Sequence, residues 1–85
     1  MISKEVIFTY DFHAISTAYF VNEASKIQSS ITIVIGNKKV NAKTILGVMS
    51  LEIIKGDKAH IIVDGIDEVE GMDKIKYLVN TPPSN

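Results

Sequence analysis

The 85-residue chain contains no cysteine and no arginine, and its only prolines, Pro82 and Pro83, stand near its end. Without cysteine the chain can form neither a disulfide bridge nor a thiolate metal site. The chain also has only two histidines, so we expect no metal site and no other cofactor. The absence of arginine also means that no bidentate guanidinium fork is available to hold a phosphate.

Neither sign of charge is in excess, because nine lysines face ten acidic residues. Nucleic-acid-binding domains usually carry a basic surplus, so no nucleic-acid partner is expected. The first residues lack the apolar run of a signal peptide, and no window approaches the ~18 apolar residues of a membrane span. We therefore expect a cytoplasmic protein without membrane insertion. Its single domain is expected over residues 1–80, followed by a disordered polar tail over residues 81–85.

The spacing of apolar residues predicts four strands and three helices. Strands are expected over residues 6–10, 31–35, 38–42 and 59–63, and helices from residue 16, over residues 44–51 and over residues 67–79. Gly36 and Asn37 are typical of a two-residue hairpin turn. The order βαββαβα favours one antiparallel sheet covered by helices on a single face.

Finer expectations concern the first and last helices. Ser16 or Thr17 is expected to cap the first helix. The buried faces are expected to carry Ala18, Tyr19, Val21 and Ala24 in the first helix, and Val69, Met72, Ile75 or Lys76, and Val79 in the last.

One internal segment, Lys39 to Leu51, closely resembles the regulatory segment of the HPr phosphocarrier family, which usually has a serine where this chain has Thr44. Residues 21–26, 54–57 and 63–65 also stand at the family spacing. The resemblance extends over residues 6–79. It implies an α/β (α+β) open-faced sandwich, in which three helices cover one face of a four-stranded antiparallel sheet.

The first loop departs from the family pattern of glycine, aliphatic residue, histidine, alanine, arginine and proline. This chain keeps His13 and Ala14, but Asp11 replaces the glycine, Ile15 the arginine and Ser16 the proline. The arginine would offer a charge to a phosphate, and isoleucine cannot. Asp11, if it points toward the histidine, would oppose a bound dianion and stabilise protonated His13.

The resemblance implies that His13 accepts a phosphoryl group from enzyme I, with phosphoenolpyruvate as the source, and passes it to sugar-specific transport proteins of the phosphotransferase system. Such a protein is a carrier and not an enzyme in its own right. Neutral imidazole is a good nucleophile near pH 7. The backbone amides of Ala14 and Ile15, at a helix N-terminus, would hold the resulting anion.

The altered loop leaves an alternative open, in which the chain is a non-carrier regulatory paralogue that acts as a protein-interaction module. The retained His13 favours the carrier, and the replacements at positions 11 and 15 favour the module. Outside the family context, His13 would be an ordinary solvated loop residue.

A second implied site is Thr44, which stands where family members are phosphorylated by HPr kinase and then bind the catabolite control transcription factor. The neighbouring Ile45, Leu46 and Met49 resemble the family's docking patch for enzyme I and the kinase. Two plainer interpretations remain open. Thr44 could serve only as a helix cap, and the three apolar residues could belong partly to the core.

Overall fold

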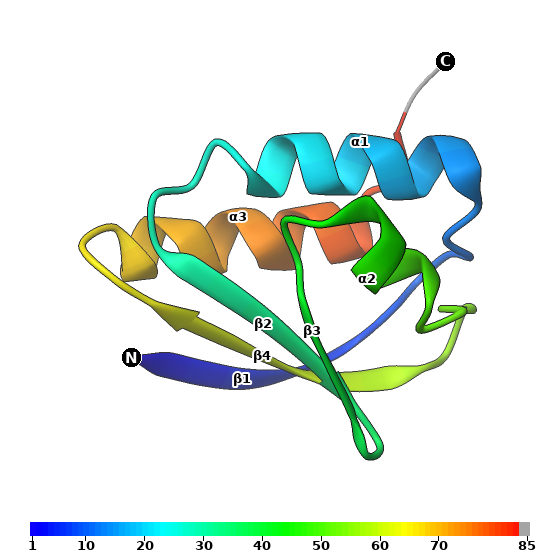
Figure 1. Ribbon diagram of the computed structural model, residues 1–85, viewed down its shortest axis with the longest axis horizontal. Helices are drawn as coiled ribbons and strands as arrows, with labels where there is room; N and C mark the ends of the chain where they lie inside the picture. The colour runs from blue at the N-terminus through cyan, green and yellow to red at the C-terminus, as the bar shows by residue number, and fades with distance from the viewer. Residues whose placement is uncertain (84–85) are drawn as a thin grey trace.

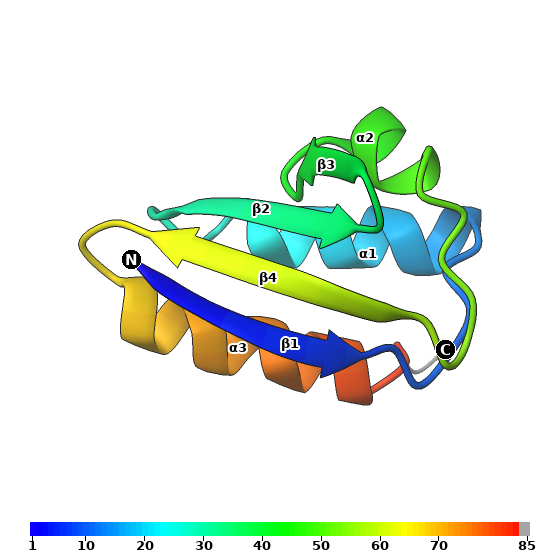
Figure 2. The same ribbon diagram turned by 90° about the horizontal axis from the view of Figure 1, so that it is seen from below.

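The computed structural model describes residues 1–83 and contains one four-stranded antiparallel sheet with all three helices on one face (Figures 1 and 2). The predicted order βαββαβα and the open-faced sandwich are confirmed. The elements are β1 (Ile2–Ile7), α1 (Ala14–Ala24), β2 (Ser30–Ile35), β3 (Lys38–Asn41), α2 (Ile45–Met49), β4 (Lys58–Asp64) and α3 (Glu68–Asn80).

The sheet has the strand order β1-β4-β2-β3, so its central strands are β4 and β2. Ile33 of β2 stands opposite Ile61 of β4, and Ile31 stands opposite Val63. All four side chains point toward the helices and are buried, as the alternation of a pleated strand requires. The residues that alternate with them along the strands, among them the exposed His60, lie on the open face. Gly36, with φ of 59°, and Asn37 close the predicted hairpin between β2 and β3.

Two long helices, α1 and α3, run side by side along the sheet, and the short α2 lies near β3 (Figure 1). Glu23 of α1 joins the two long helices, because it pairs with Lys26 at 2.8 Å and with Lys74 of α3 at 3.2 Å. Between the helices and the sheet lies one core, whose fully buried members include Phe8, Phe20, Ile33, Ile61, Ile75 and Leu78. Within residues 1–83 no helix has the length and apolarity needed to span a bilayer.

The first strand differs from its predicted position, because it covers Ile2–Ile7 instead of residues 6–10. Phe8 continues the inward alternation and is fully buried, but its backbone leaves β4. The Phe8 amide donates to the Asp57 carbonyl at 2.9 Å, and the Phe8 carbonyl accepts from the Gly56 amide at 2.8 Å. The apolar alternation therefore runs past the point where the strand pairing ends.

The start of α1 was also predicted wrongly, because the helix begins at Ala14 and His13 is its N-cap residue. Ser16 stands in the first turn, where its hydroxyl oxygen accepts from the His13 amide at 2.8 Å. This reach back from the third helical position replaces the capping role expected of Ser16 or Thr17. On the buried face, Phe20 is fully enclosed, whereas Ala18 is exposed.

The start of α3 is fastened to the loop between α1 and β2. The Asp67 carboxylate accepts from the amides of Gln28 and Ser29 at 2.9 and 2.8 Å, and from the Ser29 hydroxyl. The Ser29 hydroxyl and the Gln28 amide hold the pKa of Asp67 down at about 2. Gly65 permits this contact, because a Cβ there would lie 2.7 Å from Ser29 Cα. Val69, expected on the buried face of this helix, is exposed, and Leu78 is buried instead.

Candidate functional site

His13 lies between the loop that follows β1 and the first turn of α1. Its backbone is extended, with φ of −95° and ψ of −176°, and its carbonyl accepts the first helical hydrogen bond from Thr17 at 2.8 Å. Its amide is held by Ser16, as described above. The imidazole itself is 82% exposed. The backbone of His13 is therefore fixed, while its ring is open to a reaction partner.

Ala14 and Ile15 form the first turn of α1 beside His13. The first amides of a helix have no intrahelical acceptors, and the helix dipole concentrates partial positive charge there. The first turn of α1 contains no acidic side chain that would occupy this charge. An anion placed next to His13 would thus meet free N–H groups. Ile15 is 77% exposed and adds an apolar side chain at the same place.

Asp11 points toward the histidine, which the sequence left undecided. Its Oδ2 lies 3.9 Å from His13 Nε2, and its Oδ1 accepts from the Lys55 amide at 2.7 Å. Both side chains of the His13–Asp11 pair are exposed, so water screens their interaction. A dianion on His13 would nevertheless lie close to a fixed negative charge.

A cluster of aromatic side chains packs under the loop that carries His13. The Phe12 ring lies 5.1 Å from the rings of Phe8 and Tyr10 and 5.2 Å from that of Phe20, measured between centroids. The Tyr10 hydroxyl donates to the Leu78 carbonyl at 2.8 Å, and burial raises the pKa of Tyr10 to about 12. This support was not predicted, although five aromatic residues among residues 8–20 were a signal for it.

A shallow, largely apolar hollow of about 450 Å³ lies beside His13, lined by residues 10, 11 and 13–16 together with Pro82 and Pro83. The predicted tail thus contributes two prolines to the surroundings of the histidine, which its composition alone did not indicate. The last two residues of that tail, Ser84 and Asn85, lie outside the described residues.

Thr44 is the N-cap residue of α2 and is exposed. Its hydroxyl does not cap the helix, because it turns back and donates to the Asn41 carbonyl at 2.9 Å. Gly47 leaves room for this arrangement, since a Cβ at that position would collide with Thr44 Oγ1. The proton of this hydroxyl is thus directed at the Asn41 carbonyl.

The three apolar residues of the predicted docking patch lie on the outer side of α2. Leu46 is 83% exposed, and Ile45 and Met49 are each about half exposed. Val48 alone points into the core from this helix. The helix thus presents a continuous apolar side to solvent next to Thr44.

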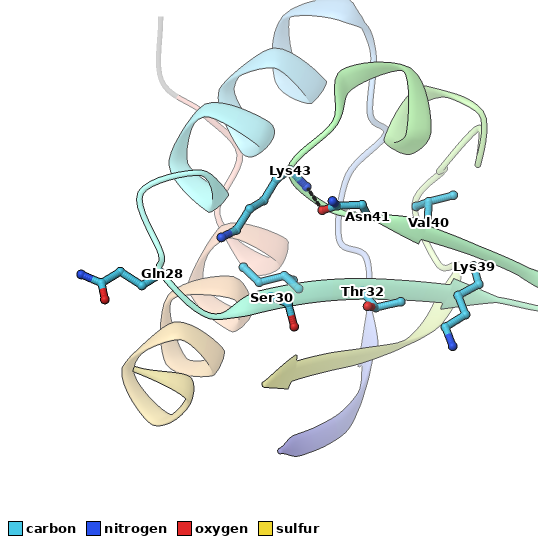
Figure 3. A pocket seen from close by; sticks show the side chains of 8 residues that line it. Gln28, Ser30, Thr32, Lys39, Val40, Asn41 and Lys43 are labelled. Atoms are coloured by element: carbon cyan, nitrogen blue, oxygen red, sulfur yellow. Dashed lines mark hydrogen bonds between the residues drawn. The ribbon is translucent and has the colours of Figure 1, made fainter. Parts of the chain in front are cut away.

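A second, more polar hollow of about 470 Å³ opens where the chain after β3 diverges from β2 (Figure 3). Its lining includes Ser30 and Thr32 of β2, Lys39 and Asn41 of β3, and Lys43. The Lys43 ammonium already donates to the Ile27 carbonyl, and the Lys43 amide donates to Asn41 Oδ1 at 2.9 Å (Figure 3). Across residues 1–83, no three His, Cys, Asp or Glu residues are grouped as metal ligands.

Known proteins resemble this chain over most of its length. A model of the family described as "PTS HPr component phosphorylation site" matches residues 3–81. The HPr-like protein Crh of Bacillus subtilis is 40% identical over 62 residues, which cover 73% of each chain. The phosphocarrier protein HPr of Xylella fastidiosa is 38% identical over 80 residues, 92% of this chain and 90% of that protein.

Among solved structures, the phosphocarrier protein HPr of Bacillus anthracis superimposes with a TM-score of 0.88 at 33% identity, covering 93% of this chain and 96% of that one. The relatives thus include both phosphocarriers and an HPr-like protein, and they share one fold with this chain. Together with the exposed histidine at the start of α1, these matches show that the chain belongs to the HPr family of phosphocarrier proteins.

Proposed function

We propose that the chain is a phosphocarrier of the phosphoenolpyruvate-dependent sugar phosphotransferase system. His13 accepts a phosphoryl group from enzyme I in the cytoplasm and passes it to sugar-specific transport proteins. One observation carries the proposal: an 82% exposed imidazole stands at the N-cap of an 11-residue helix whose first turn contains no acidic side chain. The amides of Ala14 and Ile15 hold the phosphoryl oxygens.

The transfer requires a nucleophile and groups that stabilise the negative charge of the phosphoryl oxygens. A nitrogen of the neutral His13 imidazole attacks phosphorus with its lone pair. The new P–N bond forms while the bond between phosphorus and the donor atom on enzyme I breaks, and that atom keeps the electron pair. The second transfer repeats these steps with the acceptor protein as the nucleophile, and His13 regains its lone pair.

A second function, that of a regulatory interaction module, is favoured by the Asp11 carboxylate 3.9 Å from His13 Nε2 and by the exposed Ile15. Both features disfavour a dianion and suit a protein contact. Under this alternative the outer side of α2, with Ile45, Leu46 and Met49, binds partners while His13 stays unmodified.

Regulation through Thr44 is part of both proposals. A kinase of the HPr kinase class phosphorylates the Thr44 hydroxyl, and the modified chain binds a catabolite control transcription factor. The outer side of α2 is the docking surface for the kinase and for enzyme I. The exposure of Thr44 and of its three apolar neighbours supports this assignment.

The experiment that separates the two functions is phosphoryl transfer in vitro. The purified chain is incubated with enzyme I from the same organism, phosphoenolpyruvate and Mg²⁺, and its mass is read under alkaline conditions that preserve phosphohistidine. The carrier proposal expects one added phosphate in the native chain and in His60→Ala, and none in His13→Ala. His60 is the matched control because it is the other histidine and is also exposed.

A native chain that stays unlabelled, while an ordinary HPr is fully labelled in the same mixture, would contradict the carrier proposal. The interaction module would then be the better description, and its own test is binding. Leu46→Ser should weaken the complex with the kinase, whereas His13→Ala should leave it unchanged.

A further inference from the structure

A phosphoryl group on His13 adds negative charge that the side chains of the surrounding loop do not neutralise. The group brings roughly two negative charges at neutral pH. Residues 11–16 contain one carboxylate, on Asp11, and no lysine or arginine. The amides of α1 supply only partial charge. If this chain supplies a full positive charge for the phosphoryl group, that charge lies in another segment.

The turn over residues 53–57 is the segment that the structure fastens to this loop. Two hydrogen bonds reach the loop itself, from the Phe12 amide to the Ile53 carbonyl at 3.0 Å and from the Lys55 amide to Asp11 Oδ1 at 2.7 Å. Two more bind Phe8 just before the loop, from the Gly56 amide to the Phe8 carbonyl at 2.8 Å and from the Phe8 amide to the Asp57 carbonyl at 2.9 Å. Gly56 has φ of 96°, which a glycine adopts without strain. The backbone of Lys55 is therefore held in a fixed place beside the loop.

The same carboxylate reaches both residues of interest. Asp11 Oδ1 accepts from the Lys55 amide, and Asp11 Oδ2 lies 3.9 Å from His13 Nε2. The Asp11 carboxylate therefore lies between the Lys55 backbone and the His13 imidazole and contacts both. The Lys55 side chain is exposed, and within residues 1–83 it has no hydrogen bond or ion pair that would hold it elsewhere. Its flexible four-carbon stem allows the ammonium to follow a charge that appears on His13.

We propose that Lys55 supplies the positive charge for a phosphoryl group on His13, and that Asp11 is the positioning residue that keeps Lys55 there. The inference rests on the proposed carrier function and names a residue for it. Lys55 contacts the phosphoryl oxygens through its ammonium and keeps all its protons during transfer. The role of Asp11 is then twofold, because its charge opposes the dianion while its hydrogen bond brings a cation to it.

The test compares Lys55→Met with Lys58→Met, which removes the same charge from an exposed lysine that lies opposite Ile7 on the open face of the sheet. Both variants and the native chain are labelled in two ways: by enzyme I with phosphoenolpyruvate, and chemically by phosphoramidate, which needs no partner protein. The pKa of the phosphoryl group is then followed by ³¹P NMR in a pH titration. A variant is used only if its melting temperature matches that of the native chain.

We expect Lys55→Met to slow enzymatic transfer about tenfold, less than the loss of a buried oxyanion donor because exposed charges are screened. In the chemically labelled protein it should raise the phosphoryl pKa by roughly half a pH unit. Lys58→Met should stay within about twofold of the native rate, and Lys55→Arg should restore both quantities.

Equal behaviour of the Lys55→Met and Lys58→Met variants would overturn the inference. Chemical labelling with a Lys55-dependent pKa, but no labelling by enzyme I, would reject the carrier function and leave the charge assignment standing. A His13 that neither donor can phosphorylate would reject both.

Discussion

His13 and Asp67 hold the same position in two helices, the N-cap of α1 and the N-cap of α3, but their side chains differ completely in what they contact. The Asp67 carboxylate accepts from two backbone amides and from the Ser29 hydroxyl, and so joins α3 to the loop before β2. The His13 imidazole extends into solvent, with one carboxylate oxygen 3.9 Å away.

The first turns of the two helices also differ in their acidic side chains. In α3, Glu68 and Glu70 place negative charge at the positive end of the helix dipole. In α1 the first turn carries no acidic residue, so the same positive end is left for an anion from outside. A helix start that is satisfied by its own chain stabilises the fold, and one that is left unsatisfied is available for chemistry.

Replacing each N-cap residue by alanine should separate these roles most clearly. Asp67→Ala leaves two amides and a buried hydroxyl without their acceptor, so the melting temperature should fall by roughly 5–10 °C. His13→Ala should change it by less than about 2 °C, because the exposed ring contacts little. Circular dichroism melts at pH 7 measure both. A His13→Ala variant as unstable as Asp67→Ala would mean that the imidazole holds the loop together.

The pH dependence of stability should show the same asymmetry. Hydrogen bonds lower the pKa of Asp67 from 3.8 to about 2 in the folded chain, so its contribution is fully present above pH 3.8. That contribution is lost as the pH falls through about 2, because the folded carboxyl is then protonated as well. The difference in unfolding free energy between the native chain and Asp67→Asn should therefore shrink below pH 4. A difference that stays constant down to pH 2 would contradict the role of the ionised carboxylate.

Local patterns were sufficient for much of the fold. The β2–β3 hairpin followed from Gly36 and Asn37, and β4 followed from a β-branched run. The end of β1 was missed because the buried Phe8 continues the alternation after its backbone has moved to a different partner. The start of α1 was missed because the Ser16 hydroxyl turns back to the His13 amide instead of capping an amide further along.

In the candidate site, the sequence places together the residues that are close in the chain, but it does not indicate those that come from distant segments. His13, Ala14 and Ile15 are neighbours in sequence, so the loop and helix start placed them together. Lys55 reaches the loop across 44 positions through the Asp11 carboxylate, and Pro82 and Pro83 reach it from the end of the chain. No periodicity or propensity encodes such contacts, because they depend on how the sheet and helices pack.

The charge of Asp11 can be removed without removing its hydrogen bond. Asp11→Asn keeps an oxygen that accepts from the Lys55 amide, but it no longer repels a phosphoryl group on His13. Transfer from enzyme I should therefore become about threefold faster at low salt, and the gain should shrink at 1 M salt, where the Debye length is ~3 Å. Asp73→Asn, on the exposed side of α3, is the control and should change the rate little. A slower Asp11→Asn variant would mean that the negative charge assists transfer.

The smallest effect is expected at the third N-cap residue, Thr44, which lies between the other two in its contacts. Its hydroxyl makes one hydrogen bond, to the Asn41 carbonyl, on an exposed part of the chain. Thr44→Val should lower the unfolding free energy by about 0.5–1 kcal/mol, and Thr44→Ser, which keeps the donor, by less. Urea denaturation with unchanged m-values measures both. Equal losses in the two variants would mean that the methyl group removed in Thr44→Ser contributes as much as the hydroxyl removed in Thr44→Val. No loss in either would mean that the Thr44 hydroxyl is as free as the His13 imidazole, and that only Asp67 among the three N-cap side chains serves the fold.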